Sequence, residues 1–350
     1  MEEYFFKNHL ITADLSVKEA LKKLDNLASD AILFLVDDES KLIGSLTDGD
    51  IRRGIINGAS IDQPLIDFIQ PNPKYILKNN YNINEIISYR NDYLKIIPVV
   101  DSLHRVVNII NYRTKKSYLP IDAIIMAGGR GQRLQPLTDT TPKPLLKIGE
   151  KPIIEYGIDR LNQFGINNIW ISLNYLGEQI QNHFGNGENK NIKIEYVREK
   201  EALGTIGAAS KINRFENDYI LVTNSDLLTN VDYEHFFIEF IKECADFAVL
   251  TIPYQVSVPY AILETENNII QNFKEKPTYT YYANGGIYLM KKEMLDHIPK
   301  DTFFNSTDLM EKLISEKYKV ISYPFLGYWL DVGKHEDFKK ANQDIKNFKF

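Results

Sequence analysis

The 350-residue sequence has little of several features that would point to particular classes of protein. Its single cysteine, Cys244, excludes an internal disulfide framework and a cysteine-rich zinc site, and it fits a reducing cytoplasm. No stretch approaches the roughly 18 apolar residues that cross a bilayer. The acidic start, Met1-Glu2-Glu3, lacks the basic and then apolar pattern of a signal peptide. We therefore expect a cytoplasmic protein without a membrane partner.

Charge and composition narrow the class further. Lys and Arg number 41 against 47 Asp and Glu, and the net charge of −6 argues against nucleic acid held by bulk charge. Hydrophobic residues make up 44%, which at this length is enough for the cores of two domains. The richness in Asn, Lys and Ile suggests a bacterial genome with a high A+T content.

A polar segment about a third of the way along the chain predicts a domain boundary. It ends at Pro120 and is followed by an apolar run, residues 121–127, which is typical of a buried parallel strand. We expect one domain at residues 1–116, a linker at 117–120 and a second domain at 121–350.

The first domain contains a weak internal repeat, in which each copy reads as helix, strand, strand, helix. In the first copy Ser16 is the expected helix N-cap, and the strands are expected at 31–36 and 41–46. In the second copy the strands are expected at 96–100 and 105–110. The pattern predicts a paired α+β domain.

Residues 42–52, Leu-Ile-Gly-Ser-Leu-Thr-Asp-Gly-Asp-Ile-Arg, resemble the nucleotide-contacting segment of a cystathionine-β-synthase (CBS) domain, and residues 8–115 resemble a tandem CBS pair. The resemblance implies that Thr47 and Asp50 contact the phosphate and ribose of an adenine nucleotide. An Asp can accept hydrogen bonds from both ribose hydroxyls, and a Thr at a helix N-terminus faces a phosphate. The alternative is that both residues only cap a helix. The second copy departs from the pattern, with Asn108, Asn111 and Thr114 in place of Gly44, Thr47 and Asp50.

Strands and helices alternate in the second half, which predicts an α/β domain with a mostly parallel sheet flanked by helices. In such sheets ligands bind beyond the carboxyl ends of the strands. The expected strands are residues 122–127, 168–173, 192–197, 219–223 and 246–252.

A glycine-rich loop follows the first of these strands, at residues 127–131 (Ala-Gly-Gly-Arg-Gly). Glycine allows close backbone approach, and exposed N–H groups ahead of a helix bind phosphate. Arg133 adds a fork-shaped cation, and two prolines restrict the backbone around Lys143. Leu134 stands where a dinucleotide fingerprint needs a further glycine, and no Gly-Lys-Ser/Thr follows as in a P-loop.

The run from residue 128 to Pro144 resembles the signature of sugar-1-phosphate nucleotidylyltransferases, and the resemblance covers residues 120–345. It implies a Rossmann-like sheet. Five later motifs agree with it. Leu-Gly-Thr-Ile-Gly-Ala at 203–208 resembles the family's base loop, and Asn-Ser-Asp at 224–226 and Trp-Leu-Asp-Val-Gly at 329–333 resemble the motifs of its two metal-binding aspartates. Phe-Lys-Glu-Lys-Pro at 273–277 resembles its sugar-phosphate motif, and Asn-Gly-Gly-Ile-Tyr at 284–288 resembles its sugar-hydroxyl motif.

The resemblance implies a reaction in which a sugar-1-phosphate oxygen attacks the α-phosphorus of a nucleoside triphosphate in line and pyrophosphate leaves. Because the phosphate nucleophile is already ionised, no general base is needed, and neutralising charge is the main task. Mg²⁺ prefers one or two carboxylates together with phosphate oxygens and water. The implied residues are Arg133 for the leaving pyrophosphate, Lys143 for the triphosphate, Lys276 for the sugar phosphate, Asp226 and Asp331 for Mg²⁺, Glu275, Asn284 and Gly285 for the sugar, and Ala127, Gly128, Gly129, Gly131, Glu199, Gly204 and Thr205 for the nucleotide.

Glu199 is the residue that bears on which nucleotide base is bound. It lies five residues before Gly204, at a position that faces the base in the resembling enzymes. A carboxylate only accepts hydrogen bonds, and guanine offers two adjacent donors on its Watson–Crick edge. The sequence therefore favours GTP. The alternative is that Glu199 is a solvated loop residue.

The sugar is less constrained, since mannose-1-phosphate and glucosamine-1-phosphate both fit the motifs. The CBS pairing resembles guanylyltransferases that make GDP-glucosamine for bacterial nonulosonic (legionaminic-type) acids, so we expect glucosamine-1-phosphate. Residues 334–350 read as one short helix without a hexapeptide β-helix, so no acetyltransferase activity is expected.

A competing hypothesis is a nucleotide-sensing regulator whose transferase half is catalytically silent. The presence of every charged motif residue favours the enzyme instead. We expect a homo-oligomer, with an adenine nucleotide as the candidate ligand of the CBS pair.

Overall fold

The computed structural model describes residues 6–347 apart from positions 79, 81 and 93, and it divides into two compact units. Unit 1 contains the chain up to Pro120 together with segments 161–167 and 185–193, and unit 2 contains the remainder. In the part of the chain that is described, no helix is long and apolar enough to cross a membrane.

Unit 1 begins with a four-stranded sheet in the order β1-β2-β3-β4. Strand β1 (Leu10–Ile11) runs parallel to β2 (Leu33–Val36). Strand β3 (Leu42–Leu46) pairs antiparallel with β2 on one side and with β4 (Gln70–Pro71) on the other.

Helices α2 (Val17–Leu27) and α3 (Asp48–Ile56) bury apolar side chains in one core with this sheet. Helix α2 begins at a capping box, in which the Ser16 hydroxyl accepts a hydrogen bond from the Glu19 N–H (3.3 Å). The expected N-cap at Ser16 is therefore confirmed.

A three-stranded sheet repeats the first part of this arrangement. Strand β5 (Ile76–Leu77) runs parallel to β6 (Ile96–Val100), which pairs antiparallel with β7 (Val106–Asn111). Both copies carry one register shift at the corresponding place, and this shared irregularity supports the internal repeat. The shift falls between Leu35 and Val36 in the first copy and between Val99 and Val100 in the second.

The second copy differs from the expected pattern after β7. Helix α4 (Ile83–Asn91) forms, but the closing helix does not, and residues 112–115 turn instead. The Asn111 Oδ1 accepts a hydrogen bond from the Arg113 N–H (3.0 Å), and the Asn111 carbonyl accepts one from Thr114 N–H (3.1 Å). An Asn side chain can accept hydrogen bonds from nearby backbone N–H groups and so stabilise a turn in place of a helix. The prediction of a helix after β7 is therefore wrong.

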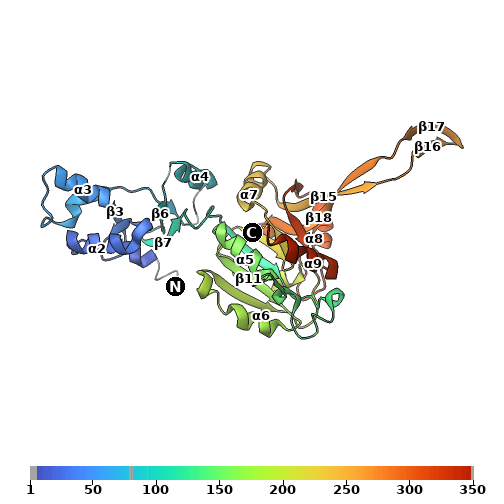
Figure 1. Cartoon of the computed structure of the whole chain (residues 1–350), viewed down its shortest axis with the longest axis horizontal. Helices are drawn as coiled ribbons and strands as arrows, with labels where there is room; N and C mark the ends of the chain where they lie inside the picture. The colour runs from blue at the N-terminus through green and yellow to red at the C-terminus, as the bar shows by residue number, and fades with distance from the viewer. Residues whose placement is uncertain (1–5, 79, 81, 93, 348–350) are drawn as a thin grey trace. The chain divides into compact units, whose positions relative to one another are not determined.

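Unit 2 is built on a seven-stranded sheet in the order β12-β11-β8-β13-β18-β15-β19. Figure 1 labels β11, β15 and β18 of this sheet, and it shows the β16–β17 hairpin extending away from the other strands of unit 2. Strand β8 runs parallel to β11 and β13, whereas β18 runs antiparallel to both β13 and β15. The mostly parallel sheet is confirmed, and each of the five expected strands is present. The bounds are β8 (Ile121–Met126), β11 (Asn168–Leu173), β12 (Lys193–Arg198), β13 (Tyr219–Asn224), β15 (Phe247–Ser257), β18 (Thr278–Lys291) and β19 (Val320–Pro324).

The order of the strands reverses between β8 and β13. The chain passes from β8 to β11 on one side and later reaches β13 on the other, so the carboxyl ends of β8 and β13 flank a crevice. The glycine-rich loop follows β8, and Ser225 and Asp226 follow β13. The topology therefore brings the expected phosphate-binding and metal-binding residues to one edge of the sheet.

A small sheet brings the second aspartate to the same edge. Strand β14 (Leu227–Thr229) pairs antiparallel with β20 (Trp329–Asp331), and this register places Leu227 opposite Asp331. The remaining elements lie wholly or largely in unit 2. They are helices α5 (Ile153–Gln163), α6 (Gly177–Phe184), α7 (Tyr233–Lys242), α8 (Ser306–Ser315) and α9 (His335–Asp344), and the strand pairs β9 (Lys147–Ile148) with β10 (Lys151–Pro152) and β16 (Ile262–Glu266) with β17 (Ile269–Lys274).

Candidate active site

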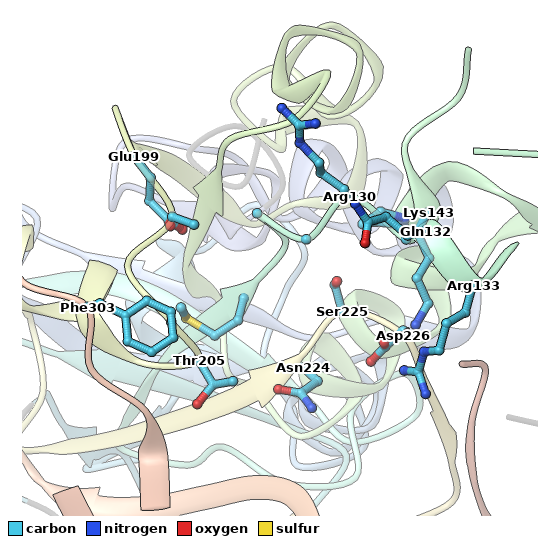
Figure 2. A pocket seen from close by; sticks show the side chains of 17 residues that line it. Arg130, Gln132, Arg133, Lys143, Glu199, Thr205, Asn224, Ser225, Asp226 and Phe303 are labelled. Carbon is cyan, nitrogen blue, oxygen red and sulfur yellow. Dashed lines mark hydrogen bonds and ion pairs between the residues drawn. The ribbon is translucent and has the colours of Figure 1, made fainter. Parts of the chain in front are cut away.

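A cavity of about 660 Å³ lies over the carboxyl ends of β8 and β13 in unit 2. Figure 2 shows Glu199, Phe303 and Thr205 on one side of it, and Lys143, Arg133 and Asp226 on the other. The lining residues are Met126, Gly128, Gly129, Arg130, Gly131, Gln132, Arg133, Lys143, Pro144, Glu199, Ala202, Gly204, Thr205, Asn224, Ser225, Asp226 and Phe303.

The shape of the loop after β8 depends on two of its glycines. Gly131 has φ of +65°, and a Cβ there would lie 2.9 Å from Thr138 Cγ2. A Cβ on Gly128 would lie 2.8 Å from Glu199 Oε1, so that glycine lets the carboxylate approach the loop. The Thr138 hydroxyl donates to the Gly131 carbonyl (3.0 Å) and fixes the turn. These contacts hold the loop backbone along the floor of the cavity.

Lys143 lies between the two aspartates. Its ammonium group is ion-paired with Asp226 and lies 3.9 Å from Asp331 Oδ1. Burial and the neighbouring Asp226 raise the pKa of Asp331, although Lys143 and Arg133 act in the opposite direction. A Cβ on Gly333 would lie 3.2 Å from an Arg133 guanidinium nitrogen, so this glycine makes room for Arg133 beside the acidic pair. Two cations and two carboxylates therefore share one corner of the cavity.

The same corner fits a divalent cation. The Oδ1 atoms of Asp226 and Asp331 are buried and accept no hydrogen bond from any described residue. Buried carboxylate oxygens without donors are costly unless a cation meets them. Two carboxylates suit Mg²⁺, which takes its remaining ligands from phosphate and water. No cluster of three or more potential metal ligands occurs in the described part of the chain.

A second cavity of about 280 Å³ adjoins the first, and Thr205 and Asn224 line both. Asn284 Nδ2 donates to the Tyr288 hydroxyl (2.9 Å), which also accepts a hydrogen bond from Ser306 Oγ (2.7 Å). Ser306 N–H donates to Thr205 Oγ1 (2.8 Å). This network joins the base loop to the expected sugar-hydroxyl motif. The lining is Thr205, Asn224, Leu227, Asn284, Gly285, Gly286, Tyr288, Asn305, Ser306, Thr307, Trp329 and Asp331.

Glu199 is 9% exposed and lines the larger cavity. Its Oε2 accepts the Leu203 N–H (3.0 Å), so the carboxylate also fixes the start of the base loop. Burial raises the pKa of Glu199, while the hydrogen bonds from Leu203 and Ser172 limit the rise. The structure therefore places Glu199 as a buried acceptor at the cavity wall and excludes the alternative of a solvated loop residue.

The structure brings most of the expected site residues together but separates two of them. The two adjoining cavities contain the expected phosphate, base, metal and sugar-hydroxyl residues apart from Ala127, which is buried behind the loop. Glu275 and Lys276 line neither cavity. They follow β17 in an exposed hairpin, in which Lys276 has φ of +42°.

The cavities also contain residues that the sequence analysis did not single out. Phe303 and Ser306 come from a segment about 100 residues after the base loop, so no local motif links them to it. Trp329 Nε1 donates to the Gly285 carbonyl (2.9 Å), and this hydrogen bond joins two parts of the wall of the smaller cavity. Arg130 lies within the quoted glycine-rich run, and its guanidinium is 5.6 Å from the centre of the Tyr175 ring. Its cationic side chain was the one signal that could have indicated a role.

Thr47 and Asp50, the expected regulatory residues in unit 1, are hydrogen-bonded to each other. The Asp50 carboxylate accepts hydrogen bonds from the Thr47 N–H (2.8 Å) and hydroxyl (2.6 Å), and it pairs with Arg53 (2.5 Å). Burial acts to raise the pKa of Asp50, but the bonds from Thr47 and Arg53 outweigh it and lower the value. The two residues thus cap helix α3, as the alternative interpretation expects.

The fold is an α/β sheet with a cavity at its topological switch point, and the glycine-rich loop, two cations and two carboxylates line or adjoin that cavity. The nucleotidyl transferase family model matches residues 122–347, and the CBS domain model matches residues 7–57. The chain belongs to the nucleotidyl transferase family, and its N-terminal part contains a CBS domain.

Several known proteins are similar to the second half of the chain. A D-glycero-alpha-D-manno-heptose 1-phosphate guanylyltransferase of Aneurinibacillus thermoaerophilus is 30% identical, over 65% of this chain and 100% of that protein. The bifunctional protein GlmU of Methanocaldococcus jannaschii is 33% identical over 64% of this chain. A UTP–glucose-1-phosphate uridylyltransferase of Synechocystis is 30% identical over 64% of this chain. The matched region spans 54% of the GlmU protein and 64% of the uridylyltransferase.

A solved structure supports the fold. A Bacillus anthracis protein provisionally assigned as a glucose-1-phosphate thymidylyltransferase superposes with a TM-score of 0.53 at 24% identity. The superposition covers 66% of this chain and 97% of that one.

Proposed function

We propose that the chain transfers a nucleotidyl group from GTP to a sugar-1-phosphate, with glucosamine-1-phosphate as the preferred acceptor, and releases pyrophosphate. Relatives named for guanylyl transfer to a sugar 1-phosphate support the reaction class. The chain carries a CBS domain beside its transferase half. This pairing resembles guanylyltransferases that make GDP-glucosamine, and on that resemblance we propose a role in making a precursor of bacterial nonulosonic acids. Mannose-1-phosphate is the alternative acceptor.

One observation carries the proposal: the glycine-rich loop, two cations and two carboxylates meet at the switch point of the sheet. Backbone N–H groups of the loop bind the triphosphate, and Arg133 and Lys143 neutralise its charge. Glu199 accepts hydrogen bonds from the base at the other wall of the cavity. The cavity thus provides groups for the base and for the triphosphate of a nucleoside triphosphate.

The chemistry follows from this charge arrangement. Asp226 and Asp331 would hold Mg²⁺, which supplies positive charge to the reacting phosphates when it is bound. Lys143 leaves Asp226 to contact the triphosphate, and Arg133 stabilises the negative charge that develops on the leaving pyrophosphate. The sugar phosphate is ionised at neutral pH, so the site needs no base to activate it.

The direct test is the product formed from GTP and glucosamine-1-phosphate with Mg²⁺. We expect GDP-glucosamine and pyrophosphate in equal amounts by mass spectrometry and a coupled pyrophosphate assay. Chelation of the metal is expected to stop both. Hydrolysis of GTP without a nucleotide-sugar product would contradict the proposal.

The base preference makes a prediction about pH. Glu199 accepts hydrogen bonds from guanine only when it is ionised, and its pKa is raised by burial. As pH falls through that raised value the carboxylate gains a proton, so GTP binding should weaken. In Glu199→Gln, kcat/KM for GTP should fall about 10- to 100-fold, because a charge-assisted hydrogen bond contributes about 1.5–3 kcal/mol. The part of the pH dependence that comes from Glu199 should disappear.

Glu201→Gln is the matched control for this prediction, since Glu201 is an exposed glutamate of the same loop. It should retain the wild-type pH profile and preference for GTP. A Glu199→Gln enzyme that still prefers GTP over UTP would contradict the role in base selection.

The CBS unit makes a separate prediction. Asp50→Ala removes the capping-box partner of Thr47 and leaves Arg53 unpaired, so the melting temperature should fall. It should also abolish any effect of AMP or ATP on the rate, without changing turnover in their absence. Glu19→Ala removes the equivalent member of the α2 capping box and serves as the control. Nucleotide sensitivity that survives in Asp50→Ala would refute adenine-nucleotide binding at this position.

A further inference from the structure

We propose that the aromatic ring of Phe303 stacks on the flat face of the nucleobase in the larger cavity. The inference rests on the proposed function, because it concerns the nucleoside triphosphate that the transferase would use. It adds a contact with the face of the base to the contact that Glu199 would make with its edge. Phe303 lies in none of the motifs quoted from the sequence, so the role is inferred from its place in the fold.

The backbone beside Phe303 is fixed against the base loop by hydrogen bonds. The Phe304 N–H donates to the Leu203 carbonyl (3.0 Å). The Phe304 carbonyl in turn accepts hydrogen bonds from the N–H groups of Ile206 (3.2 Å) and Gly207 (3.1 Å). Because its next neighbour in the chain is held at both its N–H and its carbonyl, Phe303 has a defined position relative to the base loop.

Two glycines of the base loop permit this close approach. Gly204 has φ of +79°, and a Cβ there would lie 2.5 Å from the Phe304 carbonyl oxygen. A Cβ on Gly207 would lie 2.8 Å from the Thr302 carbonyl oxygen. Any other residue at either position would push this backbone away from the loop. The glycines therefore keep Phe303 at the wall of the cavity.

The Phe303 ring faces the cavity and not the core. Phe303 lines the larger cavity and is 60% exposed, whereas Phe304 packs against a buried apolar cluster of unit 2. Figure 2 shows the ring on the same side of the cavity as Glu199 and Thr205. Among the described residues that line this cavity, Phe303 is the only aromatic one. The wall that holds the base-edge acceptor thus also presents an uncovered ring.

The two side chains suit different parts of a base. A carboxylate accepts hydrogen bonds from donors on the edge of the base, which is the part proposed for Glu199. A phenyl ring has no donor or acceptor, but it attracts the apolar face of a flat base through stacking. Since every base has such a face, stacking adds affinity without selecting among bases. Phe303 would therefore strengthen binding, and Glu199 would determine which base is preferred.

Phe303→Ala tests this division of roles. The dissociation constant for GTP should rise about 10-fold, as expected for the loss of one base–aromatic contact. Those for ATP and UTP should rise by a similar factor, so the order of preference should not change. Inorganic triphosphate has no base and should bind this variant and the wild type equally. Turnover at saturating GTP should stay near the wild-type value, because the lost contact is uniform along the reaction.

Titration calorimetry with each ligand measures these affinities, and two variants serve as controls. Phe303→Tyr keeps the ring and should bind GTP as the wild type does. Ile314→Ala removes a 57% exposed apolar side chain of α8 that lines neither cavity, and it should change nothing. Equal weakening of GTP and inorganic triphosphate in Phe303→Ala would mean that the residue only shapes the site. Unchanged GTP binding would mean that the ring does not touch the nucleotide, and either result would overturn the proposal.

A second measurement does not depend on activity and separates this proposal from the proposed function. Phe303→Trp places an indole at the same position, and a stacked guanine quenches indole fluorescence. GTP should quench this variant far more than the wild type, whose two tryptophans, Trp170 and Trp329, give the background, and inorganic triphosphate should not. Quenching in an enzyme that forms no nucleotide sugar would sustain the stacking and refute the transferase. Formation of a GDP-sugar without added quenching would refute the stacking alone, and a chain that binds no nucleoside triphosphate would refute both.

Discussion

Asp226→Asn is expected to lower kcat/KM about 10³-fold, the largest effect of any single substitution in the site. Asp226 lies directly after β13, pairs with Lys143 and has a buried oxygen without a donor. Replacing the carboxylate with an amide removes half of the negative charge that would hold Mg²⁺ against the reacting phosphates. A loss of about 4 kcal/mol of transition-state stabilisation corresponds to this factor.

The control is an aspartate at the other end of the same strand. Asp218 precedes β13, pairs with Lys292 (3.0 Å) and is far more exposed than Asp226. Asp218→Asn should keep wild-type kcat/KM. Steady-state pyrophosphate release, measured for both variants across a range of Mg²⁺ concentrations, tests whether Asp226 contributes to catalysis. Equal activities in the two variants would remove Asp226 from the chemistry.

Lys143→Ala is expected to change catalysis and metal affinity in opposite directions. In the ligand-free chain the Lys143 ammonium lies beside Asp226 and Asp331, the two carboxylates that would hold a divalent cation. Without it the two carboxylates face each other uncompensated, so the free protein should bind Mn²⁺ more tightly than wild type does. The triphosphate loses a cation at the same time, and kcat/KM should fall about 10²- to 10³-fold.

Titration calorimetry with Mn²⁺ in the absence of nucleotide measures the change in metal affinity. Steady-state kinetics measures the fall in kcat/KM. Lys147→Ala, an exposed lysine of β9, is the matched control and should change neither. Weaker Mn²⁺ binding in Lys143→Ala would show that the lysine supports the metal site instead of competing with the metal.

Local sequence signals predicted the frame of this site well. The apolar run of β8 predicts a buried strand because both of its faces are covered, and its glycines mark the loop that follows. The two aspartates were identified by motif, and the β14–β20 pairing then explains why residues about 100 positions apart meet. Where the position of a candidate residue depends on a strand end and the loop after it, the sequence was sufficient to predict that position.

Features that depend on distant contacts were not predictable in the same way. The pairing of Lys143 with Asp226 and the place of Phe303 in the cavity arise only after the sheet has formed. The local hydrogen bonds of Asn111 override the helix that the repeat predicts. For Lys276 the motif is local, but its position follows from the length of the β15–β18 ribbon, which no short motif encodes.

We propose that the larger cavity transfers a nucleotidyl group to a sugar-1-phosphate and that Glu199 selects guanine. Pyrophosphate release measured with Mg²⁺, four nucleoside triphosphates and the 1-phosphates of glucosamine, mannose and glucose tests it most directly. We expect the highest kcat/KM for GTP with glucosamine-1-phosphate. A maximum with UTP, CTP or dTTP would contradict the role of Glu199. If no pair of substrates releases pyrophosphate, with or without adenine nucleotides, the proposed transferase activity is contradicted and a nucleotide-sensing regulator is favoured.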